Sequence, residues 1–273
     1  MKKFLKVASI VLVIAMIACF AACGGGSSDD GVFKIGVQTN TTGDLYSTWD
    51  FGEDAVIRYD NGAIAVQALK SGKVDCVIID NEPAKAYVAA NEGLKILETE
   101  YAVEDYAICF QKGNDDLKNA VDKALKALIK DGSVAEIVDK YINGGDGEKV
   151  GVPVTAVDTD KPNLVMATNA EFPPYEYIDG DMYYGIDVEV AKIIADKLGY
   201  DLVIENVAFD SIIPGVQSGK YDMGMAGMTV TEDRLKSVDF SSSYATGIQA
   251  VIVAEDGAIQ TIEDLDPYYL PAE

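Results

Sequence analysis

Apolar residues in this 273-residue chain gather in short runs that are separated by amphipathic stretches. Runs such as "KVDCVIID" (73–80) and "LVMA" (164–167) have the length of buried strands. The stretch "IDVEVAKIIADKLG" (186–199) instead places its apolar residues at the 3.6-residue period of a helix. Because strands separated by helices of this length form parallel βαβ sheets, the pattern predicts an α/β fold.

The first half of the chain is expected to hold five strands. Gly72, which tolerates a left-handed backbone, is expected to end one helix, and Asn81 is expected to cap the next. A long helix with one apolar face follows residue 113, and a second follows Gly132. The predicted strands are 33–39, 55–60, 73–80, 94–98 and 106–113, with helices from Thr42 onward, 61–72 and 81–93.

Residues 143–162, "NGGDGEKVGVPVTAVDTDKP", contain glycine and proline without helical periodicity, which predicts a linker. Segments 66–80 and 213–227 each end a helix in Ser-Gly-Lys-x-Asp and enter a buried strand. This repeat is either a common turn or the mark of two similar lobes, and we favour two lobes with ligand-facing loops. After the linker, the predicted strands are 164–167, 200–207, 221–228 and 247–255, and the helices are 186–199, 209–220 and 231–238.

The N-terminus has the composition of a secretion signal. Three lysines precede an almost wholly apolar stretch, 7–22, which is too short to span a membrane. The sequence "FAAC" followed by "GGGSSDD" is similar to a bacterial lipobox. We therefore expect a signal peptide over 1–22, lipidation of Cys23 and a flexible tether over 23–32. Processing at Cys19, or cleavage without lipidation, are the alternatives.

Charge and composition narrow the functional classes. The formal net charge of −23 becomes −26 when the three lysines of the signal peptide are removed, which argues against nucleic acid and anionic lipid as partners. The chain has no histidine, which excludes Ser-His-Asp and Cys-His catalysis and the HExxH zinc site, and we predict no cofactor. Cys76 and Cys109 lie in strand-like runs and are expected to be buried free thiols rather than a disulfide.

The segment "AGMTVTEDR" (226–234) combines groups that bind an anion. Thr231 can cap a helix, which places Arg234 in the first turn beside the backbone N–H groups of Gly227 and Thr229. A guanidinium with amide donors and a hydroxyl forms a bidentate clamp for a carboxylate. An arginine at this position can equally be a solvated surface residue, so the segment alone does not distinguish a carboxylate clamp from an exposed side chain.

Other segments supply complementary groups. Thr41 and Thr42 offer hydroxyls and N–H groups at a strand-to-helix junction. Asp80 ends a buried strand, where its carboxylate could hold an ammonium group or help to cap the next helix. Phe172 and Phe209 could enclose a ligand side chain, although aromatics beside prolines often serve packing alone. Together these residues match the charges of a free α-amino acid.

At this point the chain resembles the polar amino-acid-binding proteins of ABC importers, the extracellular solute-binding proteins of family 3. The resemblance covers nearly all of residues 33–266. It implies a two-lobed fold of the type II periplasmic-binding-protein class, in which each lobe is a mostly parallel sheet flanked by helices. The matching strings are "ATNAEFPPYEY", "GIDVEVAKIIADKLG", "FDSIIPGVQSGKYDMGMAGMTVTEDR", "KIGVQTNTTGD", "GAIAVQALKSGKVDCVIIDNEPAKAYV" and "YAICFQKGNDDLKNAVDKALKALIKDG".

The resemblance assigns roles to the candidate residues. Arg234 would grip the α-carboxylate of the ligand, aided by Thr229 and, across the cleft, by Thr42. Gly227 would offer backbone contacts to the ammonium group, and Asp80 would be its counter-charge. Phe172 and Phe209 would be the ring platforms.

Two positions depart from the family pattern. Asn169 stands where relatives that bind basic or amide side chains often carry Asp, which argues against a cationic ligand. Asn40 stands where many relatives carry Gly, and Asn tolerates the left-handed backbone. With Phe172, Phe209 and Gln38, Asn169 favours a neutral polar or modestly apolar ligand side chain.

The two halves stand in the reverse of the family order, and a circular permutation explains this. Residues 143–162 would join the family's usual C- and N-termini, and Lys34 would then lie near Asp266. The rival explanation is a tandem gene cut out of frame. We expect one lobe over 31–105 plus 256–270 and the other over 106–255, including hinge strands 106–111 and 247–255.

These features predict an exported lipoprotein of the cell surface or periplasm that is anchored in the membrane through its lipid. As a monomer, it would capture a free amino acid by hinge closure and deliver it to an ABC permease. One alternative is a dehydratase acting on cyclohexadienyl acids, with Glu171 or Glu176 as a cleft acid. Another is a ligand-sensing module.

Overall fold

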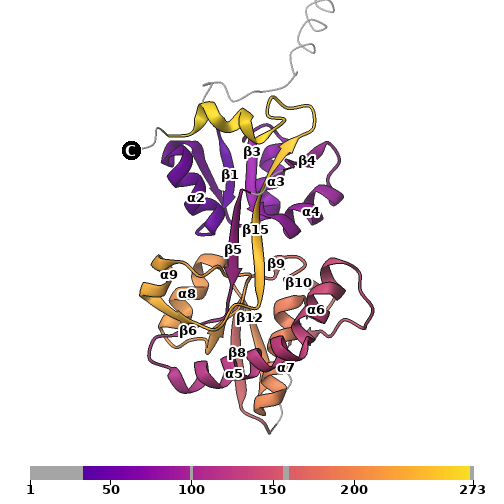
Figure 1. Ribbon diagram of the computed structural model, residues 1–273, viewed down its shortest axis with the longest axis vertical. Helices are drawn as coiled ribbons and strands as arrows, with labels where there is room; N and C mark the ends of the chain where they lie inside the picture. The colour runs from indigo at the N-terminus through magenta and orange to yellow at the C-terminus, as the bar shows by residue number, and fades with distance from the viewer. Residues whose placement is uncertain (1–32, 99–100, 156–159, 271–273) are drawn as a thin grey trace, which may run out of the picture. The chain divides into compact units, whose positions relative to one another are not determined.

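The computed structural model describes residues 33–98, 101–155 and 160–270, and the expected signal peptide, Cys23 and the tether lie outside them. The described chain forms two lobes, each built on its own sheet (Figure 1). Within these ranges, no helix combines the length and apolar composition needed to cross a lipid bilayer.

The first lobe is built on a sheet with the strand order β2-β1-β3-β15-β4 (Figure 1). Strands β4 and β5 pair with successive halves of β15. Strands β1 and β3 are buried along their whole length, as their continuous apolar runs require. The elements are β1 (Ile35–Gln38), α2 (Thr42–Phe51), η1 (Glu53–Ala55), β2 (Val56–Tyr59), α3 (Gly62–Lys70), β3 (Cys76–Asp80), α4 (Asn81–Ala90), β4 (Leu94–Ile96), β5 (Ala102–Tyr106), β15 (Ala245–Ala254) and η2 (Ile262–Tyr268).

The second lobe is built on a sheet with the order β12-β8-β13-β6-β14, beside a small antiparallel sheet β7-β11-β10-β9. Helix α5 presents the apolar face expected from the sequence, and Val121, Leu125 and Leu128 are buried on it. The elements are β6 (Cys109–Gln111), α5 (Asp115–Asp131), α6 (Ser133–Ile142), β7 (Val152–Pro153), β8 (Asn163–Thr168), β9 (Glu171–Phe172), β10 (Glu176–Asp179), β11 (Met182–Tyr184), α7 (Ile186–Leu198), β12 (Asp201–Asn206), α8 (Phe209–Gln217), β13 (Met223–Gly224), α9 (Glu232–Ser237) and β14 (Val238–Phe240).

The prediction of parallel sheets is confirmed for three strands in each lobe. Strands β2, β1 and β3 are parallel, and so are β12, β8 and β13. The next strand in each sheet, β15 or β6, runs antiparallel. Each of these strands arrives directly from the other lobe rather than through a helical crossover, so nothing forces it to be parallel.

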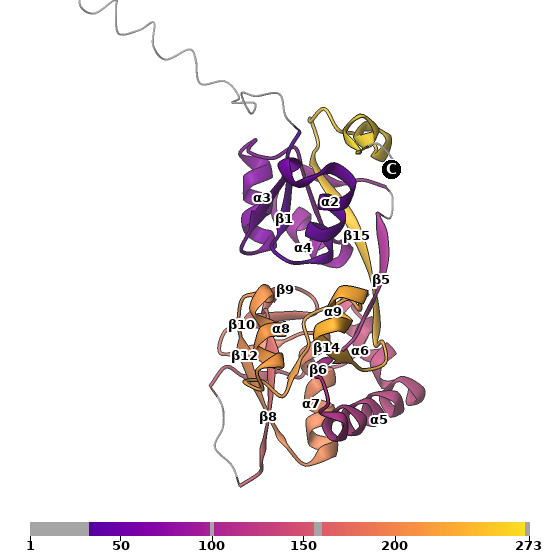
Figure 2. The same cartoon turned by 90° about the vertical axis from the view of Figure 1, so that its left-hand side faces the viewer.

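The chain crosses between the lobes twice, at residues 107–108 and 241–244, and Figure 2 shows β5 and β15 leading to these crossings. The crossings are hydrogen-bonded to each other: Ser241 N–H donates to Ile108 O (2.9 Å) and Tyr244 N–H to Tyr106 O (2.9 Å). Strand β15, which contains most of the expected hinge strand 247–255, pairs with β3, β4 and β5 in the first sheet, and its role as a hinge stays a prediction. The apolar sequence of β15 predicts that the strand is buried, but it does not predict which sheet the strand joins.

Residues 143–155 are not the free coil that their composition predicts. Strand β7 pairs with β11, and Val152 is buried. Lys140 donates to Glu148 O (3.1 Å) and forms a 2.5 Å ion pair with Glu189 on α7. Val150 N–H donates to the same carboxylate (3.2 Å). Contacts to distant residues hold this segment, and periodicity along the chain cannot predict them.

The two ends of the described chain lie together in the first lobe. The rings of Phe33 and Tyr268 stack with centroids 4.1 Å apart. Leu265 is fully buried in the same apolar cluster as Phe33. Leu270 N–H donates to Asp50 O (2.6 Å). The segment that ends at Leu270 thus packs in the first lobe, with which it was grouped in the sequence analysis.

The predictions for helix ends and for the two cysteines mostly agree with the structure. Gly72 has a positive φ of 70° after α3, as expected of a residue that ends a helix. Helix α4 begins at Asn81, so the cap position falls on Asp80, one residue earlier than predicted. Cys76 and Cys109 are free and buried, which confirms the thiol prediction for both.

Candidate functional site

The structure brings all ten predicted ligand-contacting residues to one small cavity between the two lobes. Six come from the second lobe and four from loops and strand ends of the first. Glu176 and Ala226 also line the cavity. The ten are Gln38, Thr41, Thr42, Asp80, Asn169, Phe172, Phe209, Gly227, Thr229 and Arg234.

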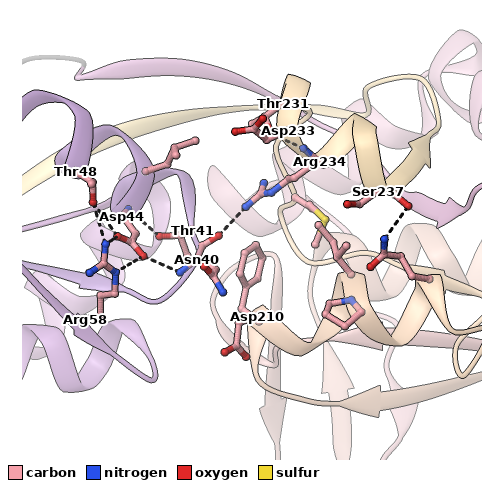
Figure 3. A pocket seen from close by; sticks show the side chains of 16 residues that line it. Asn40, Thr41, Asp44, Thr48, Arg58, Asp210, Thr231, Asp233, Arg234 and Ser237 are labelled. Carbon is pink, nitrogen blue, oxygen red and sulfur yellow. Dashed lines mark hydrogen bonds and ion pairs between the residues drawn. The ribbon is translucent and has the colours of Figure 1, made fainter. Parts of the chain in front are cut away.

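The cavity is too small for an amino acid in this conformation. Its volume is about 20 Å³, which is room for one water molecule. A groove of about 520 Å³ lies beside it, and Thr41, Phe209 and Arg234 line both spaces (Figure 3). An amino acid therefore fits this cavity only when the lobes separate.

Arg234 lies where the two lobes meet. The Oγ1 atom of Thr231 accepts from Arg234 N–H (3.1 Å), so the predicted helix cap is confirmed. The guanidinium donates to Thr229 O (2.8 Å) in its own lobe. It also donates to Asn40 O (3.0 Å) across the cleft (Figure 3). It also lies 5.3 Å from the ring centroid of Phe209, a cation–π contact. Carbonyl oxygens are weaker partners than a carboxylate, so an anionic ligand can displace the contact to Asn40.

Asp80 ends β3 with its carboxylate buried. No partner among the described residues hydrogen-bonds its Oδ1 atom. Burial, and then the charge of Glu104, raises the pKa of Asp80 to about 8, and the charge of Arg234 acts in the opposite direction. Its side chain forms no cap bond to α4, so the capping role that the sequence left open is not observed. A buried acceptor without a partner is suited to a cationic group.

Glu104, on β5, is a site residue that the sequence analysis missed. Its Oε2 atom accepts from Thr42 Oγ1 (3.0 Å), Thr229 Oγ1 (3.1 Å) and Gln249 Nε2 (3.0 Å). Its Oε1 atom is buried, and Tyr46 is a further side-chain hydrogen-bond partner of the same carboxylate. Glu104 thus joins the first lobe, the second lobe and β15. Its strand was not predicted, and a glutamate in "YAVEDY" gives no local sign of burial.

The two threonine hydroxyls differ from their expected role. The family resemblance implied that Thr42 and Thr229 assist Arg234 at a carboxylate. Each hydroxyl has one proton, and both protons are donated to Glu104. Neither hydroxyl has a proton left for a carboxylate, so both present only lone pairs to the cavity.

Gln38 and Asn169 face each other from opposite lobes. Gln38 Nε2 donates to Asn169 Oδ1 (2.9 Å), and Asn169 Nδ2 donates to Val207 O (3.0 Å). Both side chains are buried. Opening the cleft breaks the bond between them and releases two carboxamides to a polar ligand side chain.

Gly227 lies against the aromatic wall of the cavity. Its φ of 52° is left-handed, and a Cβ atom there would be 2.9 Å from the ring of Phe172, so the position requires glycine. The sequence predicted that the N–H of Gly227 is free to bind an anion. In the structure this N–H instead donates to Asp187 (2.8 Å). Its carbonyl remains the group that can contact an ammonium ion.

A pair of buried acids lies behind this wall. Glu176 lines the cavity, is 1% exposed and shares a side-chain hydrogen bond with Asp187. Burial, and then the neighbouring Asp187, raises the pKa of Glu176 well above its usual value. Burial also raises the pKa of Asp187 to about 6, although Gly227 N–H and Tyr244 O–H donate to it. Glu176 was considered only as a catalytic acid, and Asp187 was missed because a buried helical aspartate resembles a surface one in sequence.

The described residues contain no group of three or more cysteine, aspartate or glutamate side chains arranged to hold a metal ion. The arrangement can instead bind a small zwitterion. The guanidinium of Arg234 is a cationic donor at the cavity. The hydroxyl oxygens of Thr42 and Thr229 and the carboxyl of Asp80 are acceptors that line the same cavity.

Comparison with known sequences agrees with this geometry. A family model described as "Bacterial extracellular solute-binding proteins, family 3" matches residues 50–144 and 164–263, which is well over half of the chain. The two matched segments fall on either side of the segment predicted as a linker.

Individual relatives match over shorter stretches. The arginine-binding extracellular protein ArtP of Bacillus subtilis is 39% identical over 108 residues, 40% of this chain and 42% of its own. A probable histidine-binding protein of Neisseria gonorrhoeae is 32% identical over 123 residues, 45% of each chain. A solved ancestral arginine-binding protein bound to arginine is 45% identical over 29% of this chain and 35% of its own, with a TM-score of 0.28. The chain thus spans less than half the length of the curated relatives it matches.

Proposed function

Because this chain belongs to the bacterial extracellular solute-binding proteins of family 3, we propose that it is the amino-acid-binding component of an ABC importer. It captures a free amino acid between its lobes and delivers it to a membrane permease. It acts outside the cytoplasm as a monomer, anchored by a lipid on Cys23. Its matched relatives are named as binding proteins, which favours transport over catalysis or sensing.

One observation carries the proposal: a guanidinium from one lobe and a carboxyl group from the other line the same cavity. Arg234 comes from the second lobe and Asp80 from the first. The α-carboxylate of a ligand would replace Asn40 O as a partner of the guanidinium. The α-ammonium would contact Asp80, the two threonine oxygens and Gly227 O. Water exclusion on closure strengthens each charged contact.

The side chain of the ligand would contact the remaining wall. Asn169 and Gln38 favour a neutral polar side chain, and relatives are named for arginine and histidine. The oxygens of the two carboxamides can accept hydrogen bonds, and Glu176 adds a buried carboxyl group to the same wall. We therefore propose a ligand whose side chain carries N–H donors, with L-glutamine, L-arginine and L-histidine as the first candidates.

A thermal-shift panel of the purified protein against the twenty amino acids at millimolar concentration tests the function. A ligand at a hundredfold excess over its Kd adds about 2.7 kcal/mol to the free energy of unfolding. We expect clear stabilisation by at least one of the three candidates and titration calorimetry to give one site per chain. Agmatine, which is arginine without its carboxylate, is the negative control. A panel in which no amino acid raises the melting temperature would reject the function.

We also propose that the chain is a circular permutant of the family fold. The stacked rings of Phe33 and Tyr268 support this, because these residues would be connected in the usual order. Residues 143–155, packed on α7 and β11, would join the usual termini. Exchanged halves also explain why linear matches to relatives cover less than half of each chain. The lobe boundaries then fall at the crossings 107–108 and 241–244.

Restoring the usual order should preserve folding and binding. The variant consists of residues 146–270, a short Gly/Ser linker and residues 33–143. Since Phe33 already contacts Tyr268, a short linker spans the gap, and we expect the affinity for the panel ligand to stay within about threefold. Calorimetry and thermal denaturation measure both properties. A control opened inside β15, between Val251 and Ile252, should not fold, and failure of the reordered chain while the parent folds would contradict the permutation.

A further inference from the structure

We infer that Glu104 is the positioning residue that sets the direction in which the ligand zwitterion lies in the cleft. The inference rests on the proposed function, since it concerns the same cavity. Glu104 lies one contact behind the cavity, hydrogen-bonded to Thr42 of the first lobe and Thr229 of the second. Both hydroxyls line the cavity, so Glu104 acts on the ligand through them.

The physical basis is the single proton of a hydroxyl group. A threonine hydroxyl can direct its proton toward a ligand carboxylate or present a lone pair to an ammonium group. Glu104 Oε2 takes both protons, at 3.0 Å and 3.1 Å, and a carboxylate can only accept. The two oxygens therefore face the cavity as acceptors, and a carboxylate placed beside them would meet lone pairs.

Gln249 fixes this arrangement from β15. It is fully buried, and its Nε2 donates to Glu104 Oε2 (3.0 Å) and lies 3.4 Å from Thr42 Oγ1. Its Cα pairs in register with that of Asp80, the predicted counter-charge of the ammonium. The negative charge of Glu104 and the acceptors of Thr42, Thr229 and Asp80 thus lie close to one another at a cavity that Arg234 also lines.

The inference predicts that replacing Glu104 weakens the binding of ligands that carry an α-ammonium group. The binding of ligands that carry only the α-carboxylate should stay nearly unchanged. In Glu104→Gln, the charge is lost and the new amide can donate to a threonine oxygen, which turns a hydroxyl proton toward the cavity. Affinity for L-glutamine or L-arginine should fall by about tenfold or more, because hydrogen bonds to charged groups are lost. Affinity for glutaramic acid or 5-guanidinopentanoic acid, which lack the α-amino group, should change by less than about twofold.

The test is titration calorimetry of the wild-type and Glu104→Gln proteins with each amino acid and with its deaminated analogue. Equal losses for both members of a pair would overturn the inference, because a merely structural role weakens all ligands alike. A wild-type protein that binds none of the twenty amino acids would overturn the proposed function and this inference with it. Wild-type binding with equal losses would overturn the inference alone.

A second pair of variants keeps the test decisive if Glu104→Gln does not fold. Thr229→Val removes the hydroxyl and Thr229→Ser retains it. We expect Thr229→Val to lose about tenfold more affinity for the amino acid than for its deaminated analogue, and Thr229→Ser, which restores the hydroxyl, to recover most of this difference. Loss of the deaminated analogue by Thr229→Val to the same degree would show that the hydroxyl serves the carboxylate, contrary to the inference.

Discussion

Arg234→Ala should lower the affinity for the amino acid ligand at least about 100-fold, since a charged, hydrogen-bonded partner contributes a few kcal/mol. The guanidinium lines the cavity, and its hydrogen-bond acceptors among the described residues are two carbonyl oxygens, which a ligand carboxylate can replace. Titration calorimetry measures the loss directly. Thermal denaturation of the variant without ligand separates lost binding from lost folding.

Lys236→Ala is the matched control for Arg234→Ala. It removes one positive charge from the same helix, α9, but the Lys236 side chain is 75% exposed and pairs with Asp233. We expect its affinity to equal that of the wild type. Near-normal binding by Arg234→Ala, or an equal loss in Lys236→Ala, would remove the carboxylate clamp from the proposed site.

The affinity for the amino acid ligand should rise roughly tenfold for each pH unit from pH 6 toward pH 8, and the increase should level off there. One pKa unit corresponds to a tenfold change in an equilibrium constant. The pKa of Asp80 is raised to about 8, first by burial and then by Glu104, so the unliganded protein holds a proton there at neutral pH. A ligand ammonium favours the ionised carboxyl and expels that proton. Calorimetry at pH 7 in buffers of different ionisation enthalpy should therefore detect release of about one proton per ligand bound.

Asp80→Asn is the control for the pH prediction. The amide cannot titrate, so affinity should be lower and nearly independent of pH between 6.5 and 8.5. Asp187, whose pKa is about 6, would leave only a residual slope near the acid end of this range. Full proton release in Asp80→Asn would assign the titration to another group. In the absence of ligand, the raised pKa of Asp80 means that its contribution to the free energy of unfolding falls as pH rises toward 8.

Local chemistry made much of this molecule predictable. Thr41 and Thr231 cap their helices because a threonine oxygen satisfies an N–H group in the first turn, and this depends on neighbours in sequence alone. Buried parallel strands such as β3 are visible as apolar runs. Resemblance between the sequence strings and a family then brought Arg234 and Asp80 to one cavity, although 154 positions separate them in the chain.

What escaped prediction depends on partners that are distant in the chain. Glu104 is buried because three donors from separate elements satisfy one of its oxygens, and no neighbour in "YAVEDY" reveals them. Strand β15 was assigned to the wrong lobe because an apolar run fits either sheet. Residues 143–155 appeared to be a free linker because their anchor, Glu189, lies on a helix that follows some 40 residues later.

The paired crossings at 107–108 and 241–244 have a mechanical consequence. Two adjacent chain segments tied by backbone hydrogen bonds behave as a narrow ribbon, which bends easily out of its plane and resists sliding within it. The lobes then move relative to each other essentially along one coordinate, the angle at which this ribbon bends. Spectroscopic labels placed at any two points across the cleft should report the same opening curve, differing only by a scale factor.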